Sequence, residues 1–183
     1  MKYAFLPIAG AYLIELTRSS DERGSFVRVF CAREFETIGL RKSIVQINRS
    51  FSRTRGTLRG MHYQLAPHTE TKLVSCLHGS VYDVLLDLRK GSPSFLQWHA
   101  ETLQEGDDQM VSVPEGVAHG FLTLADKAEL LYFHTDFYSP SHEAGVRYND
   151  PRVGIRWPQD PTEISARDAG HQLLSEDFEG IEL

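Results

Sequence analysis

The stretch TLRGMHYQ, residues 57 to 64, places Arg59 and His62 inside a run that otherwise has the composition of a β-strand. Regular alternation would put these two side chains on opposite faces of the strand. Gly60 lies between them, and it is a natural position for a β-bulge that would re-aim one of them. Histidine transfers protons near neutral pH and arginine binds anions. The stretch is therefore either a polar edge or part of a cavity in which chemistry takes place.

Other residues of types suited to proton transfer or anion binding stand elsewhere in the chain: Lys72, His119, Tyr132 and Asp168. Each also has a purely structural interpretation. Lys72 can be a solvated strand end, and His119 can fix the turn that follows Gly116. Tyr132 can be a core aromatic with its hydroxyl at the rim, and Asp168 a helix cap. Taken singly, the structural interpretation is favoured for all of them except His119.

The elements that must position these residues are short β-prone runs separated by turns. Such runs occur at 11–16, 25–30, 43–51, 57–64, 71–78, 80–88, 96–103, 109–114, 120–124 and 128–135. Short helices are expected only at 33–40 and after Ser165. Closely spaced strands with few helices are typical of an antiparallel sandwich or jelly-roll barrel. We expect one all-β domain over residues 1–183, with a C-terminal tail from about residue 159 to 183 packed on the barrel.

Strand alternation indicates what the barrel encloses. In the run 43–51, Gln46 and Asn48 share one face, and in the run 80–88, Asp83 shares a face with apolar residues. Two carboxamides and an acid on such faces suit the wall of a polar cavity. Alternation alone equally allows Gln46 and Asn48 to face solvent.

Composition narrows the classes of partner. The formal net charge of -6 argues against a nucleic-acid or membrane-surface binder, because both select a basic face, although a local basic pocket can still hold a small anion. No run approaches the length of a membrane span, and the N-terminus does not read as a signal peptide. Cys31 and Cys76 belong to no metal or disulfide motif, so we expect reduced thiols and a cytoplasmic protein, with Cys76 a small buried hydrophobe. No dinucleotide or phosphate-loop motif is present.

The chain resembles the dTDP-4-dehydrorhamnose 3,5-epimerase family in an ordered series of motifs: DERGSF, QINRSF, TLRGMHYQ, KLVSCLHGSVYDVLLDLRKGSPSF, VPEGVAHGF, ELLYFHTDFYSP and DPRVGIRWP. The resemblance runs from about Ile8 to Asp168. It implies a cupin-type jelly roll that acts as a homodimer, without cofactor or metal. The implied reaction is epimerisation at carbons 3 and 5 of dTDP-4-dehydro-6-deoxy-glucose, which gives dTDP-4-dehydro-rhamnose.

Matching positions carry the family's catalytic roles onto this chain. His62 would be the general base, Asp168 its orienting partner and Tyr132 the general acid. The ketone at carbon 4 acidifies the hydrogens on carbons 3 and 5, so inversion needs a base and an acid on opposite walls. Lys72 is the candidate that stabilises the enolate oxygen, because a preorganised cation favours the developing charge over the neutral ketone.

Binding roles follow from the same resemblance. His119 would flank the sugar, with Asp83 supporting the charged network. The nucleotide diphosphate would be held by Arg23, Phe26, Gln46, Asn48 and Arg59, with Tyr138 stacked on the base. Some of these contacts, including that of Arg23, are expected to come from the neighbouring subunit of the dimer. An arginine fork binds the phosphate oxygens bidentately, which is how an acidic protein can hold an anionic ligand.

Two alternatives and one departure stand beside this hypothesis. The protein could be a mono-epimerase acting on a different nucleotide 4-keto-6-deoxy sugar. It could also be a metal-dependent cupin oxygenase using His62, Glu70 and His119, but Gln64 stands where such a site needs a second histidine, and a carboxamide is a poor replacement. The departure is Arg28, because better-known family members carry a glutamate there, which leaves the preferred base open.

Overall fold

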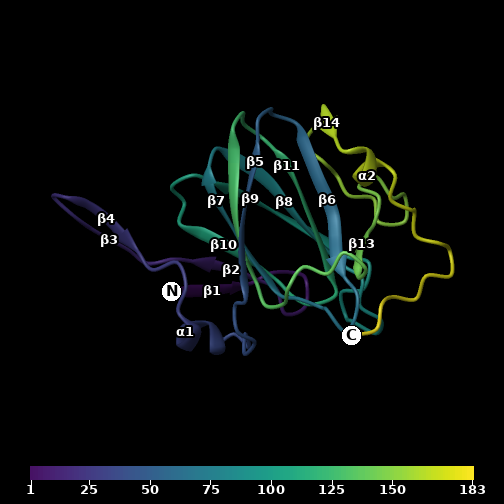
Figure 1. Ribbon diagram of the computed structural model, residues 1–183, viewed down its shortest axis with the longest axis horizontal. Coiled ribbons are helices and arrows are strands. Elements are labelled where there is room, and N and C mark those ends of the chain that lie inside the picture. The colour runs from purple at the N-terminus through teal and green to yellow at the C-terminus, as the bar shows by residue number, and fades with distance from the viewer.

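Two antiparallel sheets face each other and form a cupin-type jelly-roll barrel with short flanking helices (Figure 1). The computed structural model describes all residues 1–183. Its strands are β1 Lys2–Phe5, β2 Tyr12–Glu15, β3 Arg18–Asp21, β4 Gly24–Val27, β5 Gln46–Ser52, β6 Thr57–Gln64, β7 Lys72–His78, β8 Ser80–Asp87, β9 Trp98–Gln104, β10 Gln109–Val113, β11 Val117–Thr123, β12 Ala128–His134, β13 Glu143–Gly145 and β14 Glu163–Ile164. Its helices are α1 Ala32–Glu36 and α2 Ala166–Ala169.

Sheet order brings together strands that are far apart in the chain. The first sheet has the order β1-β2-β10-β7-β12-β5, and the second has the order β13-β6-β11-β8-β9 with β14 added to β6 in parallel. Residues of β5, β7 and β12 in the first sheet line one cavity together with residues of β6 and β11 in the second. These five strands carry most of the polar residues that the sequence singled out.

The space between the sheets is filled by an apolar core at one end of the barrel. Its members include Val74, Leu85, Leu103, Val111 and Phe121. Cys76 is buried in this core, as the sequence predicted, and burial raises the pKa of its thiol to about 11.

The outer faces of both sheets are covered by the rest of the chain. Phe35 of α1 packs on the first sheet against Ile14 and Leu73. Trp157 and Phe178 of the C-terminal segment belong to the cluster over the second sheet. Figure 1 shows this segment running along the side of the barrel beside β6 and β13. Packing on both sides fixes the sheets, so side chains between them are held in place.

A β-bulge at Gly60 re-aims the side chains of β6, as the sequence predicted. His62 pairs with His119 of β11, whereas Arg59 pairs with Phe121, so two residues of β6 oppose one of β11. The extra residue turns both Arg59 and His62 toward the inside of the barrel.

Glycine is required at this crossing for steric reasons. Gly60 has a φ of +122°, and a Cβ there would lie 2.5 Å from the Cα of Gly120 on β11. A Cβ on Gly120 would in turn lie 2.9 Å from the carbonyl oxygen of Arg59. The two strands therefore approach closely only because neither residue has a side chain.

The predicted strands match the observed ones with small shifts, but four were missed. The run 57–64 coincides with β6, while the run 25–30 is strand only to Val27 and the helix expected at 33–40 is α1, Ala32–Glu36. The missed strands are β1, β3, β13 and β14. β3 pairs with β4 in a hairpin that extends away from the barrel (Figure 1). Neither helix has the length or apolarity needed to cross a bilayer.

Candidate active site

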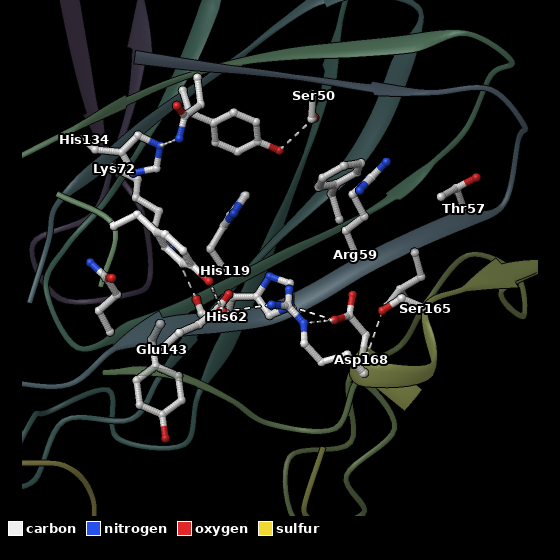
Figure 2. A pocket seen from close by; sticks show the side chains of 18 of the residues that line it. Ser50, Thr57, Arg59, His62, Lys72, His119, His134, Glu143, Ser165 and Asp168 are labelled. Atoms are coloured by element: carbon white, nitrogen blue, oxygen red, sulfur yellow. Dashed lines mark hydrogen bonds and ion pairs between the residues drawn. The ribbon is translucent and has the colours of Figure 1, made fainter. Parts of the chain in front are cut away.

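A cavity of about 630 Å³ opens between the two sheets (Figure 2). It gathers most of the residues that the sequence analysis named: Asn48, Arg59, His62, Lys72, His119, Tyr132, Tyr138 and Asp168. Four others lie outside its lining: Arg23, Phe26, Gln46 and Asp83.

His62 and Asp168 form a hydrogen-bonded pair on one wall, where Figure 2 shows them directed toward each other. His62 Nε2 lies 2.8 Å from Asp168 Oδ1, and the other carboxylate oxygen accepts a bond of 3.1 Å from the backbone N–H of Gly60. Burial acts to raise the pKa of Asp168, but the bonds from His62 and Gly60 outweigh it and hold that pKa well below its usual range. Asp168 is therefore an ionised acceptor whose geometry the β6 bulge fixes.

The charge state of Asp168 determines the tautomer of His62. An ionised carboxylate can only accept hydrogen bonds, so the proton of a neutral His62 sits on Nε2. The Nδ1 atom of His62 is then left with a free lone pair. This is the arrangement that a general base requires.

The C-terminal segment brings Asp168 to the wall through a short parallel pairing. Glu163 and Ile164 of β14 pair with Thr57 and Leu58 of β6. The chain then enters α2, whose N-cap Ser165 accepts a hydrogen bond of 3.0 Å from the backbone N–H of Asp168. Asp168 is thus placed by strand pairing and by a helix cap.

Tyr132 lies on the opposite sheet, on β12. Its hydroxyl is 3.3 Å from Ser50 Oγ, and its ring meets that of His119 edge to face with centroids 6.1 Å apart. Burial raises the pKa of Tyr132 above its usual value, and this effect outweighs the bond to Ser50. Tyr132 therefore keeps its proton at neutral pH and above.

His119 is held by an acid that does not itself reach the cavity. His119 Nε2 lies 2.8 Å from Oδ2 of Asp83, whose side chain is fully buried. The other oxygen, Oδ1, has no hydrogen-bond partner. Asp83 therefore fixes the position of the His119 ring from behind and is not part of the cavity wall.

Lys72 belongs to a buried network that the sequence analysis recognised only in part. Lys72 Nζ lies 3.3 Å from Glu70 Oε1, and His134 Nδ1 lies 2.7 Å from Glu70 Oε2. Burial acts to raise the pKa of Glu70, but His134 and Lys72 hold it below its usual value. His134 also lies 3.3 Å from the Asn48 amide. His134 was missed, although its spacing of two from Tyr132 on one strand signals a shared face.

Arg59 lies at the other end of the cavity and is anchored by the edge strand. Its Nε donates to Ser52 Oγ and its Nη2 to the backbone oxygen of Phe51, both at 3.2 Å. These bonds aim the guanidinium along the cavity wall, where Figure 2 shows it between Ser50 and Thr57. A fixed guanidinium here is suited to an anionic ligand.

The rim near Tyr138 contains further residues that sequence reasoning missed. Tyr138 donates from its hydroxyl to Glu143 at 2.8 Å, and Glu143 also accepts from Arg167 at 2.8 Å. Gln46, outside the lining, accepts a bond of 3.3 Å from the backbone N–H of Tyr138. The only feature of the sequence that could have pointed to Arg167 as a cavity residue is its position next to Asp168.

Gln64 has a structural role that its position in the motif did not reveal. Its amide accepts from the backbone of Ser139 at 2.7 Å and donates to the carbonyls of His68 and Phe137. It therefore joins the loop after β6 to the loop after β12.

The residues of the metal alternative do not converge. Glu70 is bonded to His134 and Lys72, His119 to Asp83, and His62 to Asp168. A separate group of three side chains, His62, Asp168 and His171, does bring its ligand atoms together.

The β3–β4 hairpin places its residues away from the cavity of the same chain. Arg23 bonds Asp21 at 2.6 Å within the hairpin, and Phe26 is 71% exposed. Arg28, the departure from the family pattern, pairs with Glu34 at 2.9 Å outside the cavity lining.

Known proteins resemble this chain over most of its length. The family model described as dTDP-4-dehydrorhamnose 3,5-epimerase matches residues 5–176. A protein of that name from Salmonella typhimurium is 41% identical over 171 residues, covering 92% of this chain and 93% of that protein. A crystal structure of the Bacillus anthracis epimerase with TDP and PPi bound is similar with a TM-score of 0.91 and 38% identity, covering 94% and 99% of the two chains. A structure of a Legionella pneumophila 3,5-epimerase in complex with dTDP-4-keto-L-rhamnose has a TM-score of 0.89 and 38% identity, covering 94% and 92%.

Proposed function

The chain belongs to the dTDP-4-dehydrorhamnose 3,5-epimerase family and is an isomerase of that type, and we propose that His62, Tyr132 and Lys72 carry its reaction. The substrate is a dTDP-linked 4-keto-6-deoxy sugar that is inverted at carbons 3 and 5. The single observation that carries the assignment of roles is the placement of a proton acceptor and a proton donor on opposite sheets of one cavity.

The proton transfers follow from this placement. His62 Nδ1 removes the proton from the carbon next to the ketone, and the bond's electron pair moves into the enolate. Asp168 stabilises the imidazolium that forms, because its carboxylate accepts from Nε2. Tyr132 then delivers its proton to the opposite face of the carbon, and solvent restores both groups. The same cycle at the second carbon completes the double inversion.

Lys72 stabilises the charge that collects on the ketone oxygen. Its side chain is only 11% exposed and is fixed by Glu70, so little reorganisation is needed when the enolate forms. In the absence of substrate, the carboxylate of Glu70 balances the charge of Lys72. A bound enolate adds a negative charge that Lys72 stabilises.

The nucleotide diphosphate is placed at the Arg59 end of the cavity. Arg59 can grip phosphate oxygens bidentately, and Asn48 offers an amide donor on the facing strand. Tyr138 is 52% exposed at the rim, where its ring is available to stack on the base. No cofactor is needed, because both transfers move protons only.

A homodimer with shared active sites is part of the proposal. The projecting hairpin carries Arg23, whose side chain is 89% exposed, together with the exposed Phe26. The edge strand β5 turns Ile47 and Phe51 outward, at 58% and 51% exposure. An apolar edge beside a protruding arm favours pairing with a second copy, whose cavity would receive Arg23 and Phe26. We also place the protein in the cytoplasm, with its two cysteines unpaired.

Proton NMR in deuterated water tests the proposed reaction. The purified protein is mixed with dTDP-4-keto-6-deoxyglucose, without metal or nicotinamide, and deuterium uptake is followed at carbons 3 and 5. We expect enzyme-dependent exchange at both carbons and a loss of exchange in His62→Ala. Near-normal exchange in His62→Ala would refute the role of His62, and exchange at one carbon only would make the protein a mono-epimerase.

A further inference from the structure

A third ionisable side chain lies against the His62–Asp168 pair and has no role in the proposed reaction. His171 follows α2, and its Nε2 lies 3.7 Å from Asp168 Oδ1. The rings of His62 and His171 meet edge to face, with centroids 5.6 Å apart. The Nε2 atom of His171 is buried and has no hydrogen-bond partner. A buried nitrogen without a partner is unusual enough to require an explanation.

The position of the His171 ring is fixed by its surroundings. Gly145 of β13 lies directly beside it, and a Cβ on Gly145 would overlap the ring. The backbone oxygen of His171 accepts a bond of 2.8 Å from Arg147 Nε. The ring is therefore held in a space that only a glycine on β13 leaves open, and its nitrogen stays directed at Asp168.

The three side chains have the separations of a metal site. The donor atoms of His62, Asp168 and His171 all lie within 4.8 Å of one another. Four-coordinate zinc with bonds of about 2.0–2.2 Å needs neighbouring ligand atoms about 3.3 Å apart. The two separations from Asp168 Oδ1, 2.8 Å and 3.7 Å, lie on either side of that value. Small side-chain rotations suffice to bring the three atoms around one cation.

The chemistry of the donors points the same way. Two imidazoles and one carboxylate are a donor set that zinc and similar borderline cations accept. Each imidazole offers one ring nitrogen and Asp168 offers a carboxylate oxygen to a cation placed among them.

Arg167 opposes the binding of a cation. Its Nε lies 3.4 Å from Asp168 Oδ1, and its Nη2 lies 3.4 Å from His62 Nε2. Its side chain is 55% exposed, so the guanidinium can turn toward solvent when a cation binds. Its ion pair with Glu143 gives it a partner other than Asp168.

We propose that His62, Asp168 and His171 form an inhibitory site for Zn²⁺ or a similar transition-metal cation, with water as the fourth ligand. The inhibition rests on the proposed function, whereas the site itself does not. The metal takes the lone pair of His62 Nε2, so the single proton of the neutral imidazole must reside on Nδ1. That atom is the one that accepts the substrate's proton, and the loaded enzyme therefore has no base.

Metal binding is measured first, without substrate. Chelator-stripped protein is titrated with ZnCl₂ in a calorimeter at neutral pH. We expect one tight site per chain, and a loss of affinity of at least about tenfold in His171→Ala, because even residues behind a ligand contribute about 10–100-fold. His78→Ala is the matched control, since His78 pairs with Glu105 on the surface and is 54% exposed. Equal affinity in the wild type and in His171→Ala would overturn the proposal.

Two further measurements place the cation at this site. Arg167→Gln should bind Zn²⁺ more tightly than the wild type, because it removes the competing cation, and an equal or weaker affinity would contradict the assignment. In the epimerase assay, Zn²⁺ should inhibit the wild type at concentrations that match the calorimetric affinity. Inhibition of His171→Ala, relative to its own metal-free rate, should need at least about tenfold more metal. Zinc binding that depends on His171 in a protein without epimerase activity would refute the proposed function alone. Epimerase activity with zinc binding that ignores His171 would refute only the metal site.

Discussion

His62 Nε2 and Asp168 Oδ1 are 2.8 Å apart although the two residues are separated by 106 positions in the chain. The contact exists because β14 pairs with β6 and positions α2 beside the bulge at Gly60. The contact between His62 and Asp168 therefore depends on the docked C-terminal segment.

Asp168→Asn should lower kcat by about 10²–10⁴ while leaving KM nearly unchanged. The carboxamide can donate a hydrogen bond to His62 Nε2, which moves the imidazole proton to Nδ1. In a comparable histidine–aspartate pair, the wrong tautomer lowers kcat by a factor of this order. Steady-state kinetics on the purified variant provide the measurement, and circular dichroism checks its fold. A kcat within a few-fold of the wild type would show that Asp168 does not set the tautomer.

The same carboxylate should make the fold sensitive to acid. The pKa of Asp168 is lowered in the folded state, so its ionised form contributes stability above the ordinary carboxyl pKa of about 3.9. That contribution is lost as the pH falls from this value through the lower folded-state pKa. In urea unfolding from about pH 6 to about pH 2, the free energy of unfolding should therefore fall more steeply for the wild type than for Asp168→Asn. Parallel curves for the two proteins would contradict this.

Tyr132→Phe should separate proton removal from inversion. His62 is intact in this variant, so deuterium exchange at carbons 3 and 5 should continue within about tenfold of the wild-type rate, while formation of the inverted product falls by about 10²–10³. The buried hydroxyl of Tyr132, with its raised pKa, is the donor that is lost. NMR measures both rates in one sample. An equal fall in exchange and inversion would mean that Tyr132 is needed for the removal step as well.

Local pattern predicted most of the barrel, because its strands are buried on at least one face. The run 57–64 has apolar residues at packed positions and a glycine where the strands approach, and it coincides with β6. In the β3–β4 hairpin, only β4 was predicted. The strand β3 was missed because RSSD packs against no core of its own chain and has no alternation of apolar and polar residues. β14 has only two residues, too few for any periodic signal.

Most of the candidate site residues named from the sequence line one cavity. His62 lies in a distinctive stretch, whereas the roles of Lys72, Tyr132 and Asp168 rested on the family resemblance. No local pattern encodes the contact of Asp168 with a residue 106 positions away. His171 lies outside the matched motifs and becomes visible only through its distance from Asp168. Contacts such as these depend on long-range packing, which local sequence patterns do not reveal.

Gly60→Ala should destabilise the protein by about 3 kcal/mol or more and abolish activity. Its Cβ would lie 2.5 Å from the Cα of Gly120, on backbone that also has a positive φ. Gly91→Ala is the matched control, because Gly91 has a φ of +73° with nothing within 4 Å of the added Cβ. It should cost only about 1–2 kcal/mol. Urea unfolding compares the two, and similar losses would mean that the crossing of β6 and β11 is not sterically tight.

Mixed dimers should reveal whether the hairpin works in the partner's cavity. Arg23→Ala alone should raise KM by about 10–100-fold, because a charge-assisted phosphate contact is worth about 1.5–3 kcal/mol, and His62→Ala alone should be inactive. When the two variants are refolded together, half of the dimers are mixed. In each of these, the Arg23→Ala chain has an intact His62 and receives a normal hairpin from its partner.

Random pairing therefore restores about a quarter of the wild-type sites, measured at a substrate concentration too low for Arg23→Ala dimers to turn over. The control is the same mixture combined without unfolding, in which chains do not exchange. If Arg23 served its own chain, the mixed dimer would contain one site without Arg23 and one without His62. The refolded mixture would then show no more activity than the average of the two variants, and the shared active site would have to be abandoned.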